Sequence, residues 1–220
     1  MTKYESFSVT ITNKIAHIVL DRPEAMNAMH KAFWNELPEI VEDIDFGAKA
    51  RAIVISSTGK HFTAGMDLAV FGQEGTVSHS NKDPVIAAEA FYRNITQIQR
   101  SFDCLERARV PVLFALHGGI IGGGIDMISA GDIRWCTKDA FFCIQETNIA
   151  MTADVGTFPR ILNHMPEGIV RELAYTGRKM HAEECKSRGL YNDVYADQET
   201  MMEAVMALAA DIATKPPLSV

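Results

Sequence analysis

The sequence lacks long apolar runs and lacks an excess of basic residues. None of its hydrophobic stretches approaches the length needed to cross a bilayer. The formal net charge is −7 at pH 7, so there is no electrostatic footprint for nucleic acid or for an anionic membrane surface. We therefore expect neither partner, and any anionic ligand must be bound by local hydrogen-bond donors.

The sequence also lacks the marks of export and of metal binding. Its first residues, MTKYESFSVTITNK, have neither the charged-then-apolar form of a signal peptide nor the arginines of a transit peptide, which predicts a cytoplasmic location. The cysteines show no CxxC spacing and no nearby histidine cluster, so we expect reduced core thiols and no metal site. These cysteines are Cys104, Cys136, Cys143 and Cys185.

Strand and helix patterns alternate along the 220 residues, which predicts an α/β fold. Apolar runs predict a hairpin in the first 20 residues and further strands at 51–57, 110–118, IRWC, AFFCI and 190–195. Apolar residues spaced three and four apart predict helices at 30–45, 85–107, 157–165, 167–176, 181–187 and 198–214. Residues 72–84 are polar, with Gly and Pro, and are the best candidate for a mobile loop.

Two glycine-containing loops follow predicted strands. In HGGIIGGGIDMISAGD, Gly123 is the last flexible position before a helix, whose first N–H groups favour negative charge. In HFTAGMDL, the Ala64-Gly65 turn would direct the Met66 N–H toward the same space. Together the two N–H groups would form an oxyanion hole, whereas the alternative for the glycines is tight packing of a helix on a strand.

Three acidic residues follow the first of these two motifs. Asp126 lies in the first turn of the predicted helix, where it either stabilises the helix dipole or contributes to the oxyanion region. Glu146 and Asp154 lie in QETNIAMTADVG, a segment apolar enough for the interior, with no Lys or Arg between Lys138 and Arg160 to pair them. Because an unpaired buried carboxylate is costly, the two acids either face solvent or share an apolar pocket and carry out proton chemistry there.

Together these segments resemble the crotonase family, the enoyl-CoA hydratase/isomerase superfamily. The matching pieces, from about residue 8 to 195, are IVLDRPEAMNAM, HFTAGMDL, HGGIIGGGIDMISAGDIRWC and AFFCIQETNIAMTADVGTFPRI. The resemblance implies a spiral of ββα units over residues 1–195, and then, over 196–220, the start of a helical C-terminal region that runs further in relatives. It also implies acyl-CoA thioester substrates, as in fatty acid β-oxidation, assembly as a homotrimer or dimer of trimers, and no cofactor beyond the coenzyme A of the substrate.

The resemblance also implies roles for individual residues. The oxyanion hole corresponds to the N–H groups of Met66 and Gly123, and a neighbouring loop would lie along the CoA: Ala64, Gly65, Met66, Asp67 and Leu68. Hydratases of the family carry glutamates at the positions of Asp126 and Glu146 and a small residue at that of Asp154. The triplet present here is similar to that of the Δ3,5-Δ2,4-dienoyl-CoA isomerases, where Glu146 would act at C2 and Asp154 at C6, with Asp126 in support.

Two other functions stay open at this point. One is an enoyl-CoA hydratase that adds water by means of Asp126 and Glu146, and the other is a non-catalytic protein that binds acyl-CoA. Asn148 would either contact the acyl chain or bond the backbone. The implied chemistry needs no imidazole, so structural roles are expected for His61, His117 and His164. No motif for nucleophilic catalysis lies near Ser56, Ser57 or Ser129.

Overall fold

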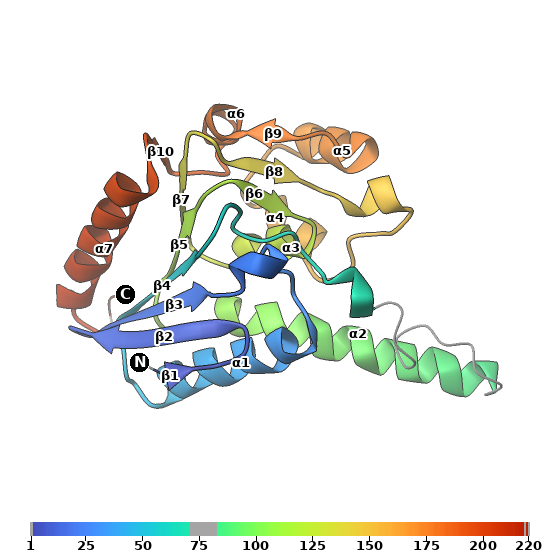
Figure 1. Ribbon diagram of the computed structural model, residues 1–220, viewed down its shortest axis with the longest axis horizontal. Helices are drawn as coiled ribbons and strands as arrows, with labels where there is room; N and C mark the ends of the chain where they lie inside the picture. The colour runs from blue at the N-terminus through green and yellow to red at the C-terminus, as the bar shows by residue number, and fades with distance from the viewer. Residues whose placement is uncertain (1, 71–82, 218, 220) are drawn as a thin grey trace.

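The computed structural model describes residues 2–70, 83–217 and 219. Most of the predicted loop at 72–84 lies outside the described residues, and its last member, Pro84, begins a helix. The elements follow one another as two strands and then a helix, a pattern that recurs along the chain (Figure 1). This recurrence gives two sheets that are covered by helices on their outer sides.

The larger sheet has seven strands in the order β1-β2-β3-β4-β5-β7-β10. The first two pairings are antiparallel, and from β3 onward all neighbours are parallel. The central strand β4 is buried at every position, as its continuous apolar run predicts. The strands are β1 (Thr2–Lys3), β2 (Phe7–Thr12), β3 (Ile15–Leu20), β4 (Ala52–Ser57), β5 (Val112–Leu116), β7 (Ile133–Thr137) and β10 (Asp193–Tyr195).

A second, three-stranded sheet has the order β6-β8-β9, with β6 (Gly119–Ile121), β8 (Phe141–Cys143) and β9 (Met180–His181). The strand predicted at 110–118 is confirmed as β5, whereas β6 was not predicted, because the chain leaves the first sheet between the two strands. It turns at Gly118, whose φ is +57°, and a Cβ atom at this position would lie only 2.2 Å from the Lys60 carbonyl oxygen. Glycine is required at this turn, and the next three residues enter the second sheet.

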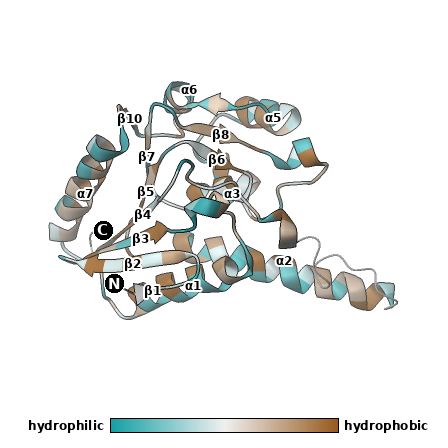
Figure 2. Cartoon of the chain, viewed as in Figure 1, coloured by the Kyte–Doolittle hydropathy of each residue, from teal (hydrophilic) through white to brown (hydrophobic). Residues whose placement is uncertain are grey.

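Helices enclose both faces of the larger sheet. On one face α1 (Lys31–Phe46) packs beside α2 (Pro84–Arg107), and α1 buries Phe33, Leu37, Ile40 and Ile44, as their spacing predicts. On the other face α7 (Gln198–Thr214) packs on β4, β5 and β7 through Met201, Val205 and Ala209. The alternation of brown and teal along these helices follows from this one-sided burial (Figure 2).

The remaining helices are short and surround the smaller sheet. They are α3 (Gly123–Ser129), α4 (Thr157–Ile161), α5 (Glu167–Thr176) and α6 (Ala182–Ser187), with 3-10 turns η1 (Pro23–Ala25), η2 (Leu68–Val70) and η3 (Glu146–Ile149). The helix predicted at 157–165 ends at Ile161, and residues 162–164 form a turn; Met165 precedes Pro166, a position that disfavours helical backbone. The strand predicted at 190–195 begins only at Asp193. The division of the chain after residue 195 stays a prediction.

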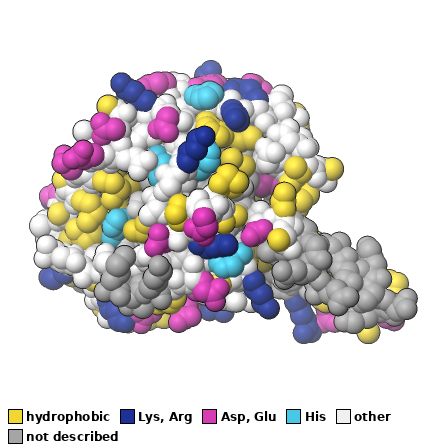
Figure 3. All heavy atoms as spheres, viewed as in Figure 1, with side chains coloured by type: hydrophobic (Ala, Val, Ile, Leu, Met, Phe, Trp, Pro, Cys, Tyr) yellow, Lys and Arg dark blue, Asp and Glu magenta, His cyan; other side chains and the backbone are white. Residues whose placement is uncertain are grey.

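The distribution of surface charge and the state of the cysteines agree with the expectations from the composition. Acidic and basic side chains are interspersed over the face shown in Figure 3. All four cysteines are free and buried, so the prediction of reduced core thiols is confirmed. Among the helices of the described residues, none has the length and apolar character to cross a membrane.

Candidate active site

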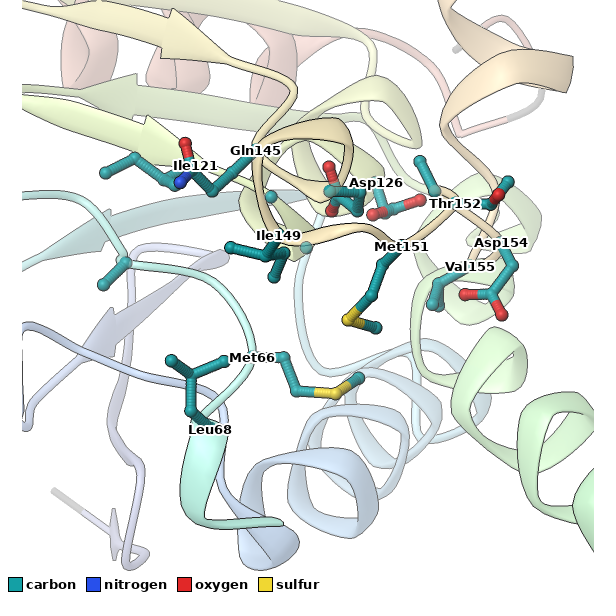
Figure 4. A pocket seen from close by; sticks show the side chains of 15 residues that line it. Met66, Leu68, Ile121, Asp126, Gln145, Ile149, Met151, Thr152, Asp154 and Val155 are labelled. Carbon is teal, nitrogen blue, oxygen red and sulfur yellow. The ribbon is translucent and has the colours of Figure 1, made fainter. Parts of the chain in front are cut away.

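A cavity of about 310 Å³ lies between the loop before η2, the start of α3 and the segment after β8. Met66 and Leu68 enter from one side, and Met151, Asp126 and Asp154 lie on the other side in the view of Figure 4. The cavity is lined by Ala64, Met66, Leu68, Ile121, Gly122, Gly123, Asp126, Gln145, Glu146, Ile149, Met151, Thr152, Ala153, Asp154 and Val155. All three acids singled out from the sequence are therefore in one largely apolar cavity.

Met66 and Gly123 bring two backbone N–H groups together at this cavity. A Cβ atom on Gly123 would lie 3.8 Å from the Met66 nitrogen, and one on Gly65 would lie 3.2 Å from the Gly123 nitrogen and 2.6 Å from the Ile121 oxygen. Gly65 also has φ +84°, so glycine alone fits between the two loops. Neither the Met66 nor the Gly123 N–H has a hydrogen-bond partner within the described part of the chain. Two unpaired donors thus meet at one point, as an oxyanion site requires.

The loop that carries Met66 is held by the segment 24–29, a support that the sequence reasoning missed. Met29 donates to the Gly65 oxygen at 2.8 Å and accepts from the Asp67 nitrogen at 3.1 Å. The buried Asn27 amide donates to the oxygens of Thr58 and His61. Asparagine in such a loop is a visible signal, because its side chain can replace backbone partners in a turn.

Asp126 lies in the first turn of α3 and is buried, with 1% of its surface exposed. Its Oδ1 accepts a hydrogen bond of 2.7 Å from the Thr157 backbone nitrogen, at the start of α4. Burial raises the pKa of Asp126 to about 7; hydrogen bonds from Thr157 oppose this shift, and the nearby Glu146 charge adds to it. Asp126 therefore joins α3 to α4 and can hold a proton near neutral pH.

Glu146 begins η3 and is half-buried at the cavity wall. Burial raises the pKa of its carboxyl, and the Asp154 charge adds to this effect against two backbone hydrogen bonds. The two following residues fix η3 to the end of α5: the Thr147 hydroxyl donates to the Ala174 oxygen, and the Asn148 amide donates to the Gly177 oxygen at 3.0 Å. Of the two readings of Asn148, the structure shows the bond to backbone.

Asp154 lies on an irregular segment between η3 and α4 and is more exposed than the other two acids. Burial nevertheless raises the pKa of its carboxyl. Besides lining the site cavity, Asp154 lines an adjoining hollow of about 380 Å³ together with Gln99, Asp103, Glu106 and Arg160. The carboxyl group therefore stands at the border between an apolar space and a polar one.

The prediction that the segment 145–156 belongs to the interior is wrong for its middle part. Ile149 is 42% exposed and Met151 is 39% exposed. Both line the cavity, so their apolar side chains face a space that a ligand can fill instead of the core.

Some predicted contact residues lie off the cavity. Gly65 is buried between the loops, and the Asp67 carboxyl accepts from the Ala69 nitrogen at 3.0 Å. The histidines bond to backbone: His61 accepts from the Gly119 nitrogen, and His117 and His164 contact the oxygens of Gly59 and Ser129. Within residues 2–70 and 83–217, no three His, Cys, Asp or Glu side chains are grouped so as to hold a metal ion.

Comparison with known proteins gives consistent matches over the chain. A family model described as enoyl-CoA hydratase/isomerase matches residues 10–220. The mitochondrial Δ(3,5)-Δ(2,4)-dienoyl-CoA isomerase of Homo sapiens is 42% identical over 99% of this chain and 66% of its own length. The peroxisomal Δ(3,5)-Δ(2,4)-dienoyl-CoA isomerase of Arabidopsis thaliana is 34% identical over 100% of this chain and 80% of its own length.

A solved structure also superimposes closely. A Thermobifida fusca protein assigned as an enoyl-CoA hydratase, in complex with acetoacetyl-CoA, has a TM-score of 0.86 at 29% identity. The match covers 97% of this chain and 82% of that one. The chain thus spans just under two thirds of the human relative and most of the solved structure.

These relatives contradict the predicted cytoplasmic location, because the human protein is named as mitochondrial and the Arabidopsis protein as peroxisomal. The prediction used only the first residues and the composition. Organelle addresses are read by receptors from short segments that are separate from the fold, so the residues that form the fold carry no such information.

Proposed function

The chain belongs to the enoyl-CoA hydratase/isomerase family, and we propose that it converts 3,5-dienoyl-CoA into 2,4-dienoyl-CoA. The family match and the structural likeness confirm the resemblance and the crotonase-type α/β fold predicted from the sequence, and with them membership of a family of enzymes. The observation that carries the proposal is the third acid: Asp154 lines the same apolar cavity as Asp126 and Glu146.

The proposed reaction begins with the thioester oxygen between the N–H groups of Met66 and Gly123. Glu146, as a carboxylate, takes a proton from C2; the C2–H bond breaks, and its electrons spread over an extended dienolate that ends on the thioester oxygen. The two amide donors stabilise this charge, an effect commonly of about 3 kcal/mol per donor. This role is supported by the observation that, among the described residues, neither of these two N–H groups has a hydrogen-bond partner.

The second half delivers a proton at C6. Asp154, as a carboxylic acid, gives up its proton; a C6–H bond forms and the double bonds end at C2 and C4. One carboxyl group cannot easily reach both carbons, whereas Glu146, on η3, and Asp154, on the segment before α4, both line the cavity. Burial raises the pKa of both carboxyl groups, and the Asp154 charge raises that of Glu146 further, so the cavity disfavours the state in which both are ionised. Asp126 orients Glu146 or a water molecule in this scheme.

The binding of the coenzyme A part is also a proposal. Ala64 and Leu68 line the cavity, and the Thermobifida fusca relative is solved with acetoacetyl-CoA. The scheme needs no cofactor other than the coenzyme A of the substrate. For the whole protein we expect the homotrimer or dimer of trimers of the family, and a role in β-oxidation.

An enoyl-CoA hydratase is the second candidate, because the two acids that would hold its water, Asp126 and Glu146, also line the cavity. A non-catalytic acyl-CoA-binding protein is the third. Ultraviolet absorbance distinguishes the three candidate functions when the purified chain is incubated with 3,5-dienoyl-CoA and, in parallel, with crotonyl-CoA. Isomerisation creates a diene conjugated to the thioester, hydration removes the conjugated enoyl band, and mere binding changes neither. Turnover of crotonyl-CoA alone would contradict the isomerase proposal.

A further inference from the structure

The segment that carries Asp154 has little backbone support of its own. Among the described residues, no backbone–backbone hydrogen bond involves residues 152–155. Val155 anchors the segment in the core, where it is 5% exposed. The position of the Asp154 main chain therefore depends on side chains from other elements.

Those side chains come mainly from one face of α2. Gln99 Nε2 donates to the Asp154 carbonyl oxygen at 2.7 Å. Asp103 and Glu106, one and two turns further along, bind the buried guanidinium of Arg160 at 2.5 and 2.9 Å. Arg160 in turn donates to the Val155 oxygen at 3.5 Å. The spacing of 99, 103 and 106 puts all three on the same side of the helix.

We propose that Gln99 is a positioning residue that sets the place of the Asp154 carboxyl in the cavity, and hence the delivery of the proton to C6. This inference rests on the proposed function. Gln99 lines the adjoining hollow and is not among the residues of the site cavity, so it acts through Asp154 and does not touch the substrate.

Gln99 is the more informative of the two anchors. Arg160 is buried and tied to two acids, so its loss would disturb α2 and α4 together. Gln99 is half-buried, and its amide makes the one hydrogen bond to the Asp154 carbonyl within the described residues. Removing this donor frees the carbonyl to turn toward water and lets the carboxyl shift, and a misplacement of about 1 Å can cost on the order of 10²-fold in rate.

The test compares Gln99→Met with a matched control, Gln97→Met. Gln97 lies on the same helix, but its amide donates to Asn35 on α1 at 3.3 Å, and within the described part of the chain it makes no hydrogen bond to the Asp154 segment. Each variant is given 3,5-dienoyl-CoA deuterated at C2. Isomerisation is followed by absorbance, and loss of deuterium from unreacted substrate is followed by mass spectrometry. The first readout needs Asp154, whereas the second needs only Glu146 and the oxyanion site.

For Gln99→Met we expect kcat for isomerisation to fall about tenfold, with KM and C2 exchange within about twofold of wild type. Gln97→Met should leave all three unchanged. An equal fall in isomerisation and C2 exchange, or no fall in either, overturns the role of Gln99. A wild-type chain that exchanges C2 but does not isomerise contradicts the proposed function itself, and this control separates the two failures.

Discussion

The two walls of the cavity are built in different ways. The amide wall, residues 63–66 with 121–123, is joined by backbone hydrogen bonds in which Thr63 pairs with Gly119 and Ile121. The acid wall, residues 145–155, is exposed over much of its length and is held by side chains: Asn148 on Gly177, Gln99 on Asp154, and Asp126 on the adjoining Thr157.

This difference separates what the two walls do. Oxyanion donors must be aimed in advance, and here a backbone ladder with glycine at the contact fixes them, together with the Thr63 hydroxyl, which accepts from the Gly65 nitrogen. The acid wall must place two carboxyl groups at different points along an acyl chain, and side-chain anchors allow each group to be placed independently. In the proposed reaction, the amide wall supplies a feature that related reactions can share, and the acid wall selects which reaction occurs.

The largest effect is expected on the acid wall from Glu146→Gln. This change keeps the shape but removes the base, so isomerisation and C2 exchange should both fall by about 10³- to 10⁴-fold. Glu167→Gln is the control, since Glu167 forms an exposed i,i+4 pair with Arg171 on α5. C2 exchange that persists at a tenth of the wild-type rate in the Glu146 variant would assign the base to another group.

On the amide wall, Gly65→Ala should cost about 10²- to 10³-fold in both reactions, because the new Cβ would force the Met66 and Gly123 loops apart. The fall should be equal for isomerisation and C2 exchange, unlike that of Gln99→Met. The control is Gly168→Ala in α5, where a Cβ would meet nothing within 4 Å. A Gly65 variant with selective loss of isomerisation would contradict the separation between the two walls.

The third prediction concerns stability instead of rate, at Asp126, which joins the two walls. Burial raises its pKa from 3.8 to about 7, so the folded state holds an extra proton between these values, and stability falls as pH rises through this window. Asn does not titrate, so Asp126→Asn removes this loss in the free energy of unfolding. The loss amounts to about 1.4 kcal/mol for each unit by which the folded and unfolded pKa values differ. In urea unfolding at pH 5 and pH 8, the free energy of unfolding of the variant, relative to that of wild type, should be higher at pH 8 than at pH 5. Equal changes in the two proteins would mean that Asp126 is ionised in the fold at both pH values.

Much of the fold could be predicted from the sequence, because an element that is buried on one side repeats its apolar residues at a regular spacing. The apolar spacing of α1 and the continuous run of β4 were predicted within one residue of their bounds. Strand β6 was not predicted, because the turn before it depends on the contact of Gly118 with Lys60, two residues far apart in sequence.

The site shows the same limit. The glycine motifs and the three acids indicated the cavity, since their chemistry is local to short segments. The supports did not show in the sequence: Gln99 lies in an ordinary helical pattern, and only the fold brings it to Asp154, 55 residues away. Likewise, Ile149 and Met151 have the composition of core residues, and only the cavity explains their exposure.

The most direct test of the two-acid scheme is Asp154→Asn, assayed for isomerisation and C2 exchange in the same reaction. The account predicts that isomerisation falls by about 10²-fold or more while C2 deuterium is still lost at a rate near that of wild type. Near wild-type formation of the conjugated diene by this variant would contradict it.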